Sequence, residues 1–283
     1  MKKLGFIGGG NMAEAMIHGL LNRRLFKAAD LIASDPEAAR RRRLARTFKI
    51  ETTGDNREVA AVSSAILIAV KPQSIDSVMD ELRLAIEPTA ANGARRRART
   101  NSKLIISIAA GVTIARLEKG FGVGARVIRV MPNAPAMVGA GMAAMVRGHA
   151  ATRVDESFAM RIFGAVGEAV ALREEALLDT VTALSGSGPA YVYLFAKALA
   201  EAAEADGLPA DLAFKMTLQT IRGAEESMRR LKLDLGELIR RVASPGGTTE
   251  AALRRFDAEH FSAIVAHAVR AAAERSRELG RGL

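Results

Sequence analysis

The sequence contains no cysteine and no tryptophan. Without cysteine there are no disulfide bonds, thiolate nucleophiles or zinc–thiolate sites, and a reducing compartment such as the cytoplasm is the expected location. Aromatic residues make up only 4% of the chain, so the stacking platforms that bind single-stranded nucleic acid are scarce. No apolar run reaches the roughly 18 residues of a membrane-spanning helix, and we expect no membrane partner.

The apolar run near the start of the chain also lacks the form of a secretory signal. Gly8 to Gly10, and then Glu14 and His18, interrupt it before it reaches the length of a signal-peptide core. We therefore expect no signal peptide, in agreement with a cytoplasmic location.

Positive charge is in excess, because 41 Lys and Arg residues against 31 Asp and Glu residues give a formal net charge of +10. Much of the excess lies in two clusters, Arg40 to Arg43 with Arg46, and Arg95, Arg96, Arg97, Arg99 with Lys103. The stretch 87–103 reads as a basic, solvated surface loop. A basic surface can bind nucleic acid, but with so few aromatic residues we expect it to attract an anionic cofactor or substrate instead.

A glycine-rich turn lies between a predicted strand, Leu4 to Ile7, and a predicted helix. Its sequence Gly8-x-Gly10-x-x-Ala13 matches the fingerprint of a dinucleotide site, for which a chance glycine loop is the alternative. Gly8 permits the tight turn, and Gly10 lets the backbone approach a pyrophosphate. Free N–H groups at the helix start face the phosphates. The expected cofactor contacts here are Ile7, Gly8, Gly10, Asn11 and Met12.

The end of the second predicted strand, 30–35, is where such a domain meets the adenosine ribose. An acidic residue there favours NAD, whereas hydroxyl and arginine side chains favour the 2′-phosphate of NADP. The chain offers both kinds, Asp35 against Ser34 and Arg40. Asp35 can equally be a helix cap before Pro36. The choice between NAD and NADP therefore stays open.

Further apolar segments predict the remaining strands, at 49–52, 64–70, 104–108, 127–131, 142–146 and 168–172. Strands that alternate with helices indicate a parallel α/β sheet, in which ligands bind at the carboxyl ends of the strands. Val70, Lys71 and Pro72 end one such strand, so Lys71 is placed to meet cofactor or substrate, with an ordinary surface lysine as the alternative. Ala109 to Val112 follow another strand and have little side-chain bulk.

Strand signals stop after residue 177, and helices are expected at 191–205, 210–230, 234–242, 249–256 and 260–279. The first of these is apolar on nearly every face, so it must be covered on all sides. The remaining residues are too few to cover it, and a partner subunit is the simplest cover.

A second glycine-rich turn, Ser244 to Glu250, opens one of these helices. Its glycines can take positive φ, its threonines can cap a helix that starts at Glu250, and its free N–H groups can hold a carboxylate. The alternative is an ordinary capped turn. A third such element, Ser185 to Pro189, precedes the long apolar helix, where it can simply be the start of that helix.

No catalytic triad or metal motif is visible among the four histidines. His260 and His267 share a helix face but have no carboxylate company, so we expect no metal. Small hydroxyls, backbone amides and a dinucleotide suit hydride transfer to a carbon–nitrogen double bond, because a protonated imine is already electrophilic.

Six segments together resemble the pyrroline-5-carboxylate reductase family over essentially the whole chain. They are 5–13, 69–73, 107–112, 129–135, 184–191 and 244–249. The resemblance implies reduction of 1-pyrroline-5-carboxylate to L-proline with NADPH or NADH, with Asn56, Val70, Lys71, Pro72 and Ala110 also near the cofactor. It implies that Ser244, Gly246, Gly247, Thr248 and Thr249 bind the substrate, with the catalytic residue Thr249 bonded to the ring nitrogen. It also implies an interlocked homodimer that can build rings of dimers.

The chain departs from the family pattern at Ala134, where threonine is usual, and at Ala243, where threonine or serine is usual. Arg241 stands where some members have an asparagine near the substrate, and 90–101 resembles a basic insertion. None of these departures obviously removes the chemistry.

We therefore expect a Rossmann-like parallel-sheet domain over 1–173 and an all-α substrate-binding and dimerisation domain over 174–283. The alternatives are another imine or β-hydroxyacid reductase of this architecture, or a dinucleotide- or RNA-binding protein without activity.

Overall fold

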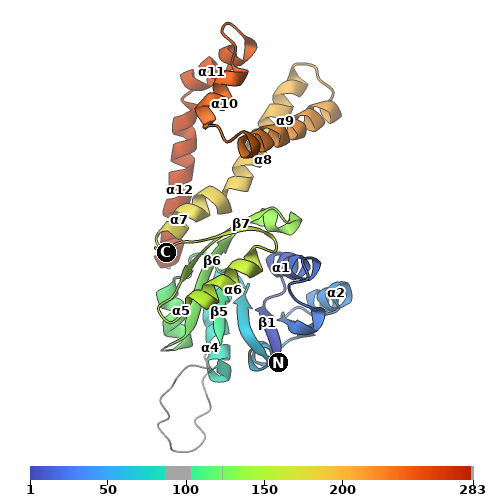
Figure 1. Ribbon diagram of the computed structural model, residues 1–283, viewed down its shortest axis with the longest axis vertical. Coiled ribbons are helices and arrows are strands. Elements are labelled where there is room, and N and C mark those ends of the chain that lie inside the picture. Colours follow the sequence, from blue (N-terminus) through green and yellow to red (C-terminus); the bar gives the residue numbers. More distant parts are fainter. Residues whose placement is uncertain (87–102, 123, 282–283) are drawn as a thin grey trace, which may run out of the picture. The chain divides into compact units, whose positions relative to one another are not determined.

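The computed structural model describes residues 1–86, 103–122 and 124–281, and it contains a sheet of eight strands in the order β3-β2-β1-β4-β5-β6-β7-β8 (Figure 1). The strands are β1 (Lys2–Ile7), β2 (Leu31–Ser34), β3 (Glu51–Thr53), β4 (Ser63–Ile68), β5 (Leu104–Ser107), β6 (Arg126–Pro132), β7 (Gly141–Arg147) and β8 (Gly167–Ala171). Each predicted strand is present. Most of the predicted basic loop, 87–102, lies outside the described residues.

The Rossmann-like sheet is confirmed, with one addition. Strands β1 to β6 pair in parallel, but β7 runs antiparallel to β6, with Val130 opposite Met145, and β8 then runs parallel to β7. Only a short turn, Ala134–Val138, joins β6 to β7. A parallel connection needs a longer crossover, so this pair must be antiparallel.

Helices follow most of the strands, and the last one reaches Arg281. They are α1 (Asn11–Asn22), α2 (Ala38–Phe48), α3 (Asn56–Val62), α4 (Ile75–Ile86), α5 (Ile114–Phe121), α6 (Arg153–Phe163), α7 (Leu177–Val181), α8 (Gly188–Ala205), α9 (Ala210–Leu231), α10 (Leu235–Val242), α11 (Thr248–Ala258) and α12 (Phe261–Arg281). None of the helices in the described part of the chain is long and apolar enough to cross a membrane.

The chain forms two compact units. The sheet unit comprises 1–186 with 272–283, and the helical unit comprises 187–271. The sheet unit thus extends beyond residue 173, where the sequence predicts this domain to end, because Leu178 of α7 is fully buried against Ala144 and Val146 of β7. It also includes the end of α12, where Ser276 donates a hydrogen bond to Asp179 at 2.6 Å.

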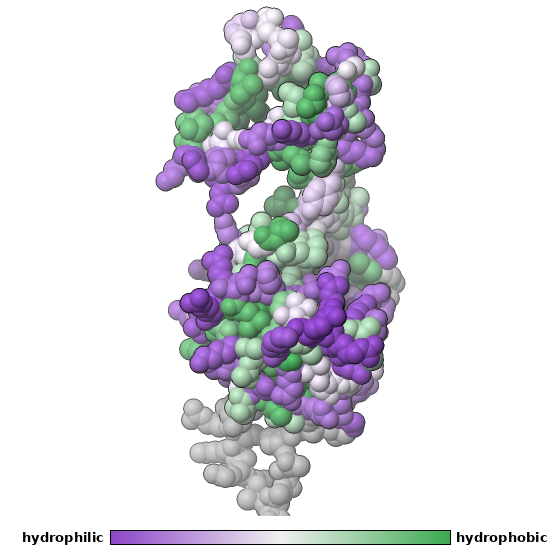
Figure 2. All heavy atoms as spheres, turned by 90° about the vertical axis from the view of Figure 1, so that its right-hand side faces the viewer, coloured by the Kyte–Doolittle hydropathy of each residue, from purple (hydrophilic) through white to green (hydrophobic). Residues whose placement is uncertain are grey.

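The helical unit leaves many large apolar side chains exposed, and Figure 2 shows hydrophobic residues on its surface. In α8, Val192, Tyr193, Leu194 and Phe195 are between 41% and 69% exposed, and Ala200 is the one buried residue of that helix. The apolar pattern of α8 is therefore unsatisfied within one chain, as the sequence predicts.

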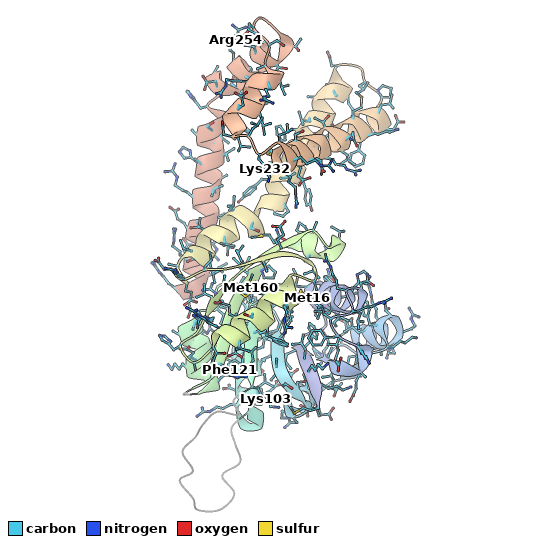
Figure 3. All side chains as sticks on the ribbon, in the orientation of Figure 1. Met16, Lys103, Phe121, Met160, Lys232 and Arg254 are labelled. Carbon is cyan, nitrogen blue, oxygen red and sulfur yellow. The ribbon has the colours of Figure 1, made fainter. Side chains whose placement is uncertain are left out.

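The sheet unit has an apolar layer on each face of its sheet. One layer joins the sheet to α1, α2 and α6 and includes Met16; the other joins it to α3, α4 and α5 and includes Phe121 (Figure 3). Alternate residues of a strand point to opposite faces, so Phe6 lies in the first layer and Ile7 in the second. Two covered faces explain the nearly continuous apolar strands.

Lys103 corrects the prediction of a fully solvated basic loop. Its ammonium group donates hydrogen bonds to the carbonyl oxygens of Ser63 at 2.7 Å and Ala61 at 3.2 Å. Desolvation lowers the pKa of Lys103, because burial disfavours the charged form. This lysine therefore anchors the start of β5.

Candidate active site

The glycine-rich turn after β1 has the space that a pyrophosphate requires. Gly8 has φ of +96°, and a Cβ there would lie 2.8 Å from the carbonyl oxygen of Ala69. Around Gly10 the space is open, since the nearest atom to a Cβ at this position would be a guanidinium nitrogen of Arg40, 3.8 Å away. Gly10 is the N-cap of α1 and no side chain caps it. The first N–H groups of α1 are therefore available to an anion.

The Asp35 side chain supports this turn through hydrogen bonds to the backbone. One carboxylate oxygen accepts the N–H of Gly9 at 2.8 Å, and the other accepts the N–H of Glu37 at 2.8 Å. The Asp35 side chain is only 5% exposed. The carboxylate thus joins the end of β2 to the glycine turn, and both of its oxygens have backbone partners.

Ser34 and Asn56 meet beside the same turn. The buried Ser34 hydroxyl lies 2.6 Å from the side-chain oxygen of Asn56 and 3.3 Å from the carbonyl oxygen of Phe6. Asn56 in turn donates to Glu81 at 2.7 Å. Asn56 is the first residue of α3, and Asp55 caps that helix.

The ends of β4 and β5 complete this edge of the sheet. Ala69 donates to the carbonyl oxygen of Ile7 at 2.8 Å, which aligns the chain before Val70, Lys71 and Pro72 with the glycine turn. Lys71 is exposed directly beyond β4, at the predicted place. After β5, Ala110 precedes a turn at Gly111, which has φ of +74°.

Hydrogen bonds join two loops that the sequence did not predict to be in contact. Asn133, which follows β6, donates to the backbone oxygen of Ser185 at 3.1 Å and to its hydroxyl at 3.2 Å, and accepts the N–H of Met142 at 2.8 Å. Ser185 belongs to a π-helical turn, Thr182–Gly186. The available signal was an asparagine between two prolines, yet nothing in the sequence identifies its partner.

The second glycine-rich turn lies in the helical unit. Gly246 has φ of +71°, and Gly247 donates to the carbonyl oxygen of Ser244 at 3.0 Å. The N–H of Gly246 donates to the Glu250 carboxylate at 2.6 Å, so this turn does hold a carboxylate, supplied by its own helix. Its other site residues, Thr248 and Thr249, form the first turn of α11.

The start of α11 corrects the prediction that threonines cap a helix beginning at Glu250. The helix begins at Thr248, its N-cap is Gly247, and no side chain caps it. Glycine is accepted at an N-cap and leaves the first N–H groups open. The hydroxyls of Thr248 and Thr249 are thus not used as caps.

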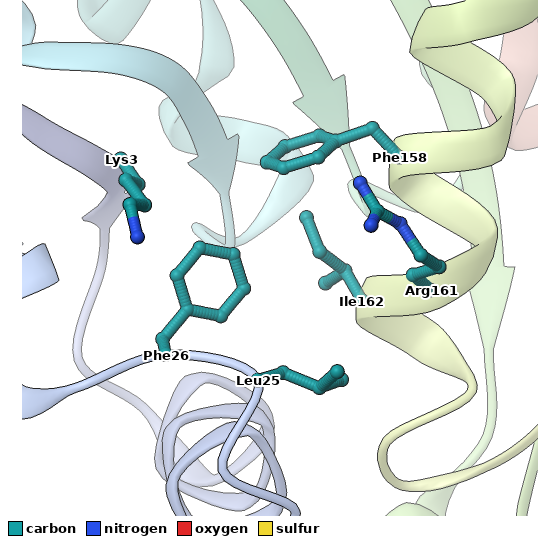
Figure 4. Close-up of a pocket in the computed structure, with 6 residues that line it drawn as sticks. All are labelled: Lys3, Leu25, Phe26, Phe158, Arg161 and Ile162. Carbon is teal, nitrogen blue, oxygen red and sulfur yellow. The ribbon is translucent and has the colours of Figure 1, made fainter.

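One cavity lies away from the glycine turn after β1, and another lies beside that turn. A cavity of about 190 Å³ between Phe26, Phe158 and Ile162 (Figure 4) includes Lys3, so it lies toward the amino end of β1, opposite the glycine turn. The described residues include no group of three or more His, Cys, Asp or Glu side chains that could hold a metal ion.

Known proteins resemble the chain over its full length. Residues 175–279 match the family model for pyrroline-5-carboxylate reductase dimerisation, and residues 3–111 match the model described as NADP oxidoreductase coenzyme F420-dependent. The pyrroline-5-carboxylate reductase of Synechocystis sp. is 41% identical over 279 residues, which cover 99% of this chain and 98% of that protein.

Two solved structures have the same fold over the same length. A pyrroline-5-carboxylate reductase from Coxiella burnetii has a TM-score of 0.88 at 32% identity, covering 98% of each chain. A Plasmodium falciparum pyrroline carboxylate reductase with NADP bound has a TM-score of 0.85 at 32% identity, covering 99% of this chain and 98% of that one. With its two glycine turns and its helical dimerisation region, this chain belongs to the pyrroline-5-carboxylate reductase family.

Proposed function

We propose that this protein reduces 1-pyrroline-5-carboxylate to L-proline with NADPH or NADH. The observation that carries the proposal is the pair of glycine turns: one is open toward an anion at the start of α1, and the other already holds a carboxylate at the start of α11. The first suits the phosphates of a dinucleotide and the second suits the carboxylate of the substrate. Sequence similarity over the full length to proteins named pyrroline-5-carboxylate reductase supports the same reaction.

We assign the cofactor site to residues at the carboxyl edge of the sheet. The turn Ile7 to Met12 would hold the pyrophosphate, through the open N–H groups of α1. Asn56 would approach the adenosine side, since it is bonded to Ser34 at the end of β2. Val70, Lys71, Pro72 and Ala110 would approach the nicotinamide side, because they follow β4 and β5.

In the helical unit, the turn Ser244 to Gly247 would orient the substrate through its carboxylate. The Thr249 hydroxyl would hydrogen-bond to the ring nitrogen. A dinucleotide bound in the sheet unit would supply the hydride to the carbon of the C=N bond. Because the protonated imine already carries its N–H proton, this hydride alone would convert it to the amine. Because the nitrogen changes from planar to tetrahedral, a bond to it contributes in the transition state. No metal enters this scheme.

The helical unit serves as a dimerisation domain, in agreement with its family match and its exposed apolar side chains. We propose a homodimer, and a ring of such dimers as a larger assembly. We expect it in the cytoplasm, because its sequence has no cysteine to form disulfides, and we expect no nucleic-acid partner.

Substitutions at Thr249 test the proposed reduction. With the purified full-length protein, NADPH oxidation on adding 1-pyrroline-5-carboxylate should show the activity itself. Thr249→Val keeps the shape but removes the hydroxyl, and a hydrogen bond to a charged group is worth about 1.5–3 kcal/mol, or roughly a 10- to 150-fold loss in kcat/KM. Thr249→Ser restores the hydroxyl and should recover most of that loss.

NADP⁺ affinity, measured by calorimetry, should be the same in all three proteins because the phosphates bind in the sheet unit. A Thr249→Val enzyme within about twofold of the parent would mean that Thr249 only starts a helix. Absence of NADPH oxidation with this substrate would instead favour another imine or a β-hydroxyacid as the true substrate.

A further inference from the structure

The structure resolves the roles of the polar residues at the end of β2, where a nucleotide-binding domain distinguishes NADPH from NADH. An aspartate at this place usually accepts the ribose hydroxyls of NADH and repels the 2′-phosphate of NADPH. Here both oxygens of Asp35 already accept backbone N–H groups, from Gly9 and Glu37, and the side chain is 5% exposed. Asp35 is therefore a structural support rather than a ribose ligand.

Ser34 is no better placed to meet a phosphate. It has no exposed surface, and its hydroxyl is bonded to Asn56 at 2.6 Å and lies 3.3 Å from the carbonyl oxygen of Phe6. Two of the three side chains that the sequence offers for nucleotide selection are thus occupied inside the protein.

Arg40 is the third, and it remains at the surface. Its side chain is 53% exposed, with one guanidinium nitrogen 3.9 Å from the Asp35 carboxylate and another 2.9 Å from Glu37. The same guanidinium would be the nearest group to a Cβ at Gly10, at 3.8 Å. An exposed pair such as Arg40–Glu37 contributes little, so a phosphate can take the place of Glu37.

Arg41 and the start of α2 add to the positive potential. Arg41 donates to the backbone oxygens of Asp35 at 2.7 Å and Pro36 at 3.0 Å, so its guanidinium is fixed beside the strand end. The 11-residue helix α2 begins with no side-chain cap, which leaves its first N–H groups open to an anion. The negative charge of Asp35 is thus surrounded by cationic and N–H groups.

We infer that this enzyme selects NADPH over NADH through Arg40, which binds the 2′-phosphate, while Asp35 positions the glycine turn without discriminating between the two nucleotides. The inference rests on the proposed function only in assigning the dinucleotide to this edge of the sheet. It requires no knowledge of the substrate.

Binding of two small probes to the full-length protein tests the inference without turnover. Adenosine 2′,5′-bisphosphate carries the 2′-phosphate and AMP lacks it, and calorimetry gives the affinity for each. The parent should prefer the bisphosphate by about 10-fold or more, as expected for charge-assisted hydrogen bonds. Arg40→Gln should lose most of that preference and leave AMP binding within about twofold.

Arg42→Gln is the matched control, because it removes the same charge from an exposed position on the same helix. It should keep the parent's preference. Equal losses in Arg40→Gln and Arg42→Gln would show that the general positive field of α2, not Arg40, attracts the phosphate. Equal binding of the two probes by the parent would overturn the inference outright.

Asp35→Asn tests whether Asp35 supports the glycine turn or repels the 2′-phosphate. The amide can replace only one of the two acceptors, so a supporting role predicts weaker binding of both probes by a similar factor. A repelling role predicts instead that the preference for the bisphosphate rises, and that result would overturn the assignment of Asp35. If the preference is found but 1-pyrroline-5-carboxylate is not reduced, the inference stands and the proposed function fails.

Discussion

The two units of the chain treat their apolar residues in opposite ways. In the sheet unit, α1 buries Ala13, Ala15, Met16, Ile17 and Leu20. In the helical unit, the longer helix α8 buries only Ala200, although it is at least as rich in apolar residues. The same hydrophobic effect acts on both helices. The difference therefore lies in what each helix has to pack against.

The sheet supplies that partner surface in the first unit. A parallel sheet covered on both faces offers each helix an apolar layer from its own chain, and both layers are complete here. The helical unit has no sheet, and its helices leave many of their large apolar side chains exposed. Its exposed apolar residues indicate that this unit is one half of an interface, in agreement with its family match.

The largest expected effect comes from charging the exposed apolar surface of α8. Leu194→Asp should raise the dissociation constant of the homodimer about 100-fold or more, because burying a leucine contributes about 1.5–3 kcal/mol and a twofold axis doubles the loss. Light scattering coupled to gel filtration should detect monomers at micromolar concentration.

Val154→Asp in α6 is the control, since Val154 is 77% exposed and Leu194 is 69% exposed. It should leave the dimer intact. If Leu194→Asp also leaves the dimer intact, the two units do not differ in the way proposed.

Two glycines with nearly the same positive φ test how crowding differs between the units. Gly8 has φ of +96° and Gly207 has φ of +97°, but a Cβ meets the Ala69 carbonyl oxygen at 2.8 Å in the first case and nothing within 4 Å in the second. Gly8→Ala should weaken NADP⁺ binding by about 10-fold or more, since the turn must shift.

Gly207→Ala carries only the conformational cost of about 1–2 kcal/mol, with NADP⁺ affinity unchanged. Thermal unfolding and calorimetry on both variants give the two quantities. Equal nucleotide affinity in both variants would show that the glycine turn does not contact the nucleotide.

The smallest expected effect concerns the aspartates that cap α3 and α10, one in each unit. Asp55 accepts the N–H of Arg57, and Asp234 accepts the N–H of Glu237. Asp55→Ala should lower the melting temperature slightly and also weaken NADP⁺ binding, because α3 carries Asn56. Asp234→Ala should lower only the melting temperature. Loss of NADP⁺ affinity in both variants, or in neither, would contradict this expectation.

The Asp55 cap also gives a pH dependence. Hydrogen bonds from the side chain and backbone of Arg57 hold the pKa of Asp55 below its ordinary value of 3.8. The folded state thus favours the charged carboxylate. The stabilisation that Asp55 gives to the fold is therefore present above pH 3.8 and is lost as the pH falls through the lowered pKa. The parent and Asp55→Ala should converge in stability toward that acid range.

Much of the sheet unit could be read from the sequence because its signals are local. The Gly8 to Ala13 spacing lies within one strand, one turn and one helix, and the structure has each of them there. The strand ends at Val70 and Ala110 were found in the same way, since apolar runs flanked by turn residues predict buried strands. Asn56, in contrast, is implied near the cofactor only by the family resemblance.

The sequence by itself determined the order of strands and helices, the two glycine turns and the excess of apolar residues in α8, because each depends on residues close together in the chain. Only the tertiary structure decided what Asp35, Asn133 and Lys103 bond to. Their partners are 26, 52 and 40 residues away in sequence. A polar side chain takes whichever donor or acceptor the fold brings within about 3 Å, and residue type alone does not name that partner. Asp35 shows the consequence, because an acid that suggests NADH in the sequence becomes a support for the glycine turn once the chain is folded.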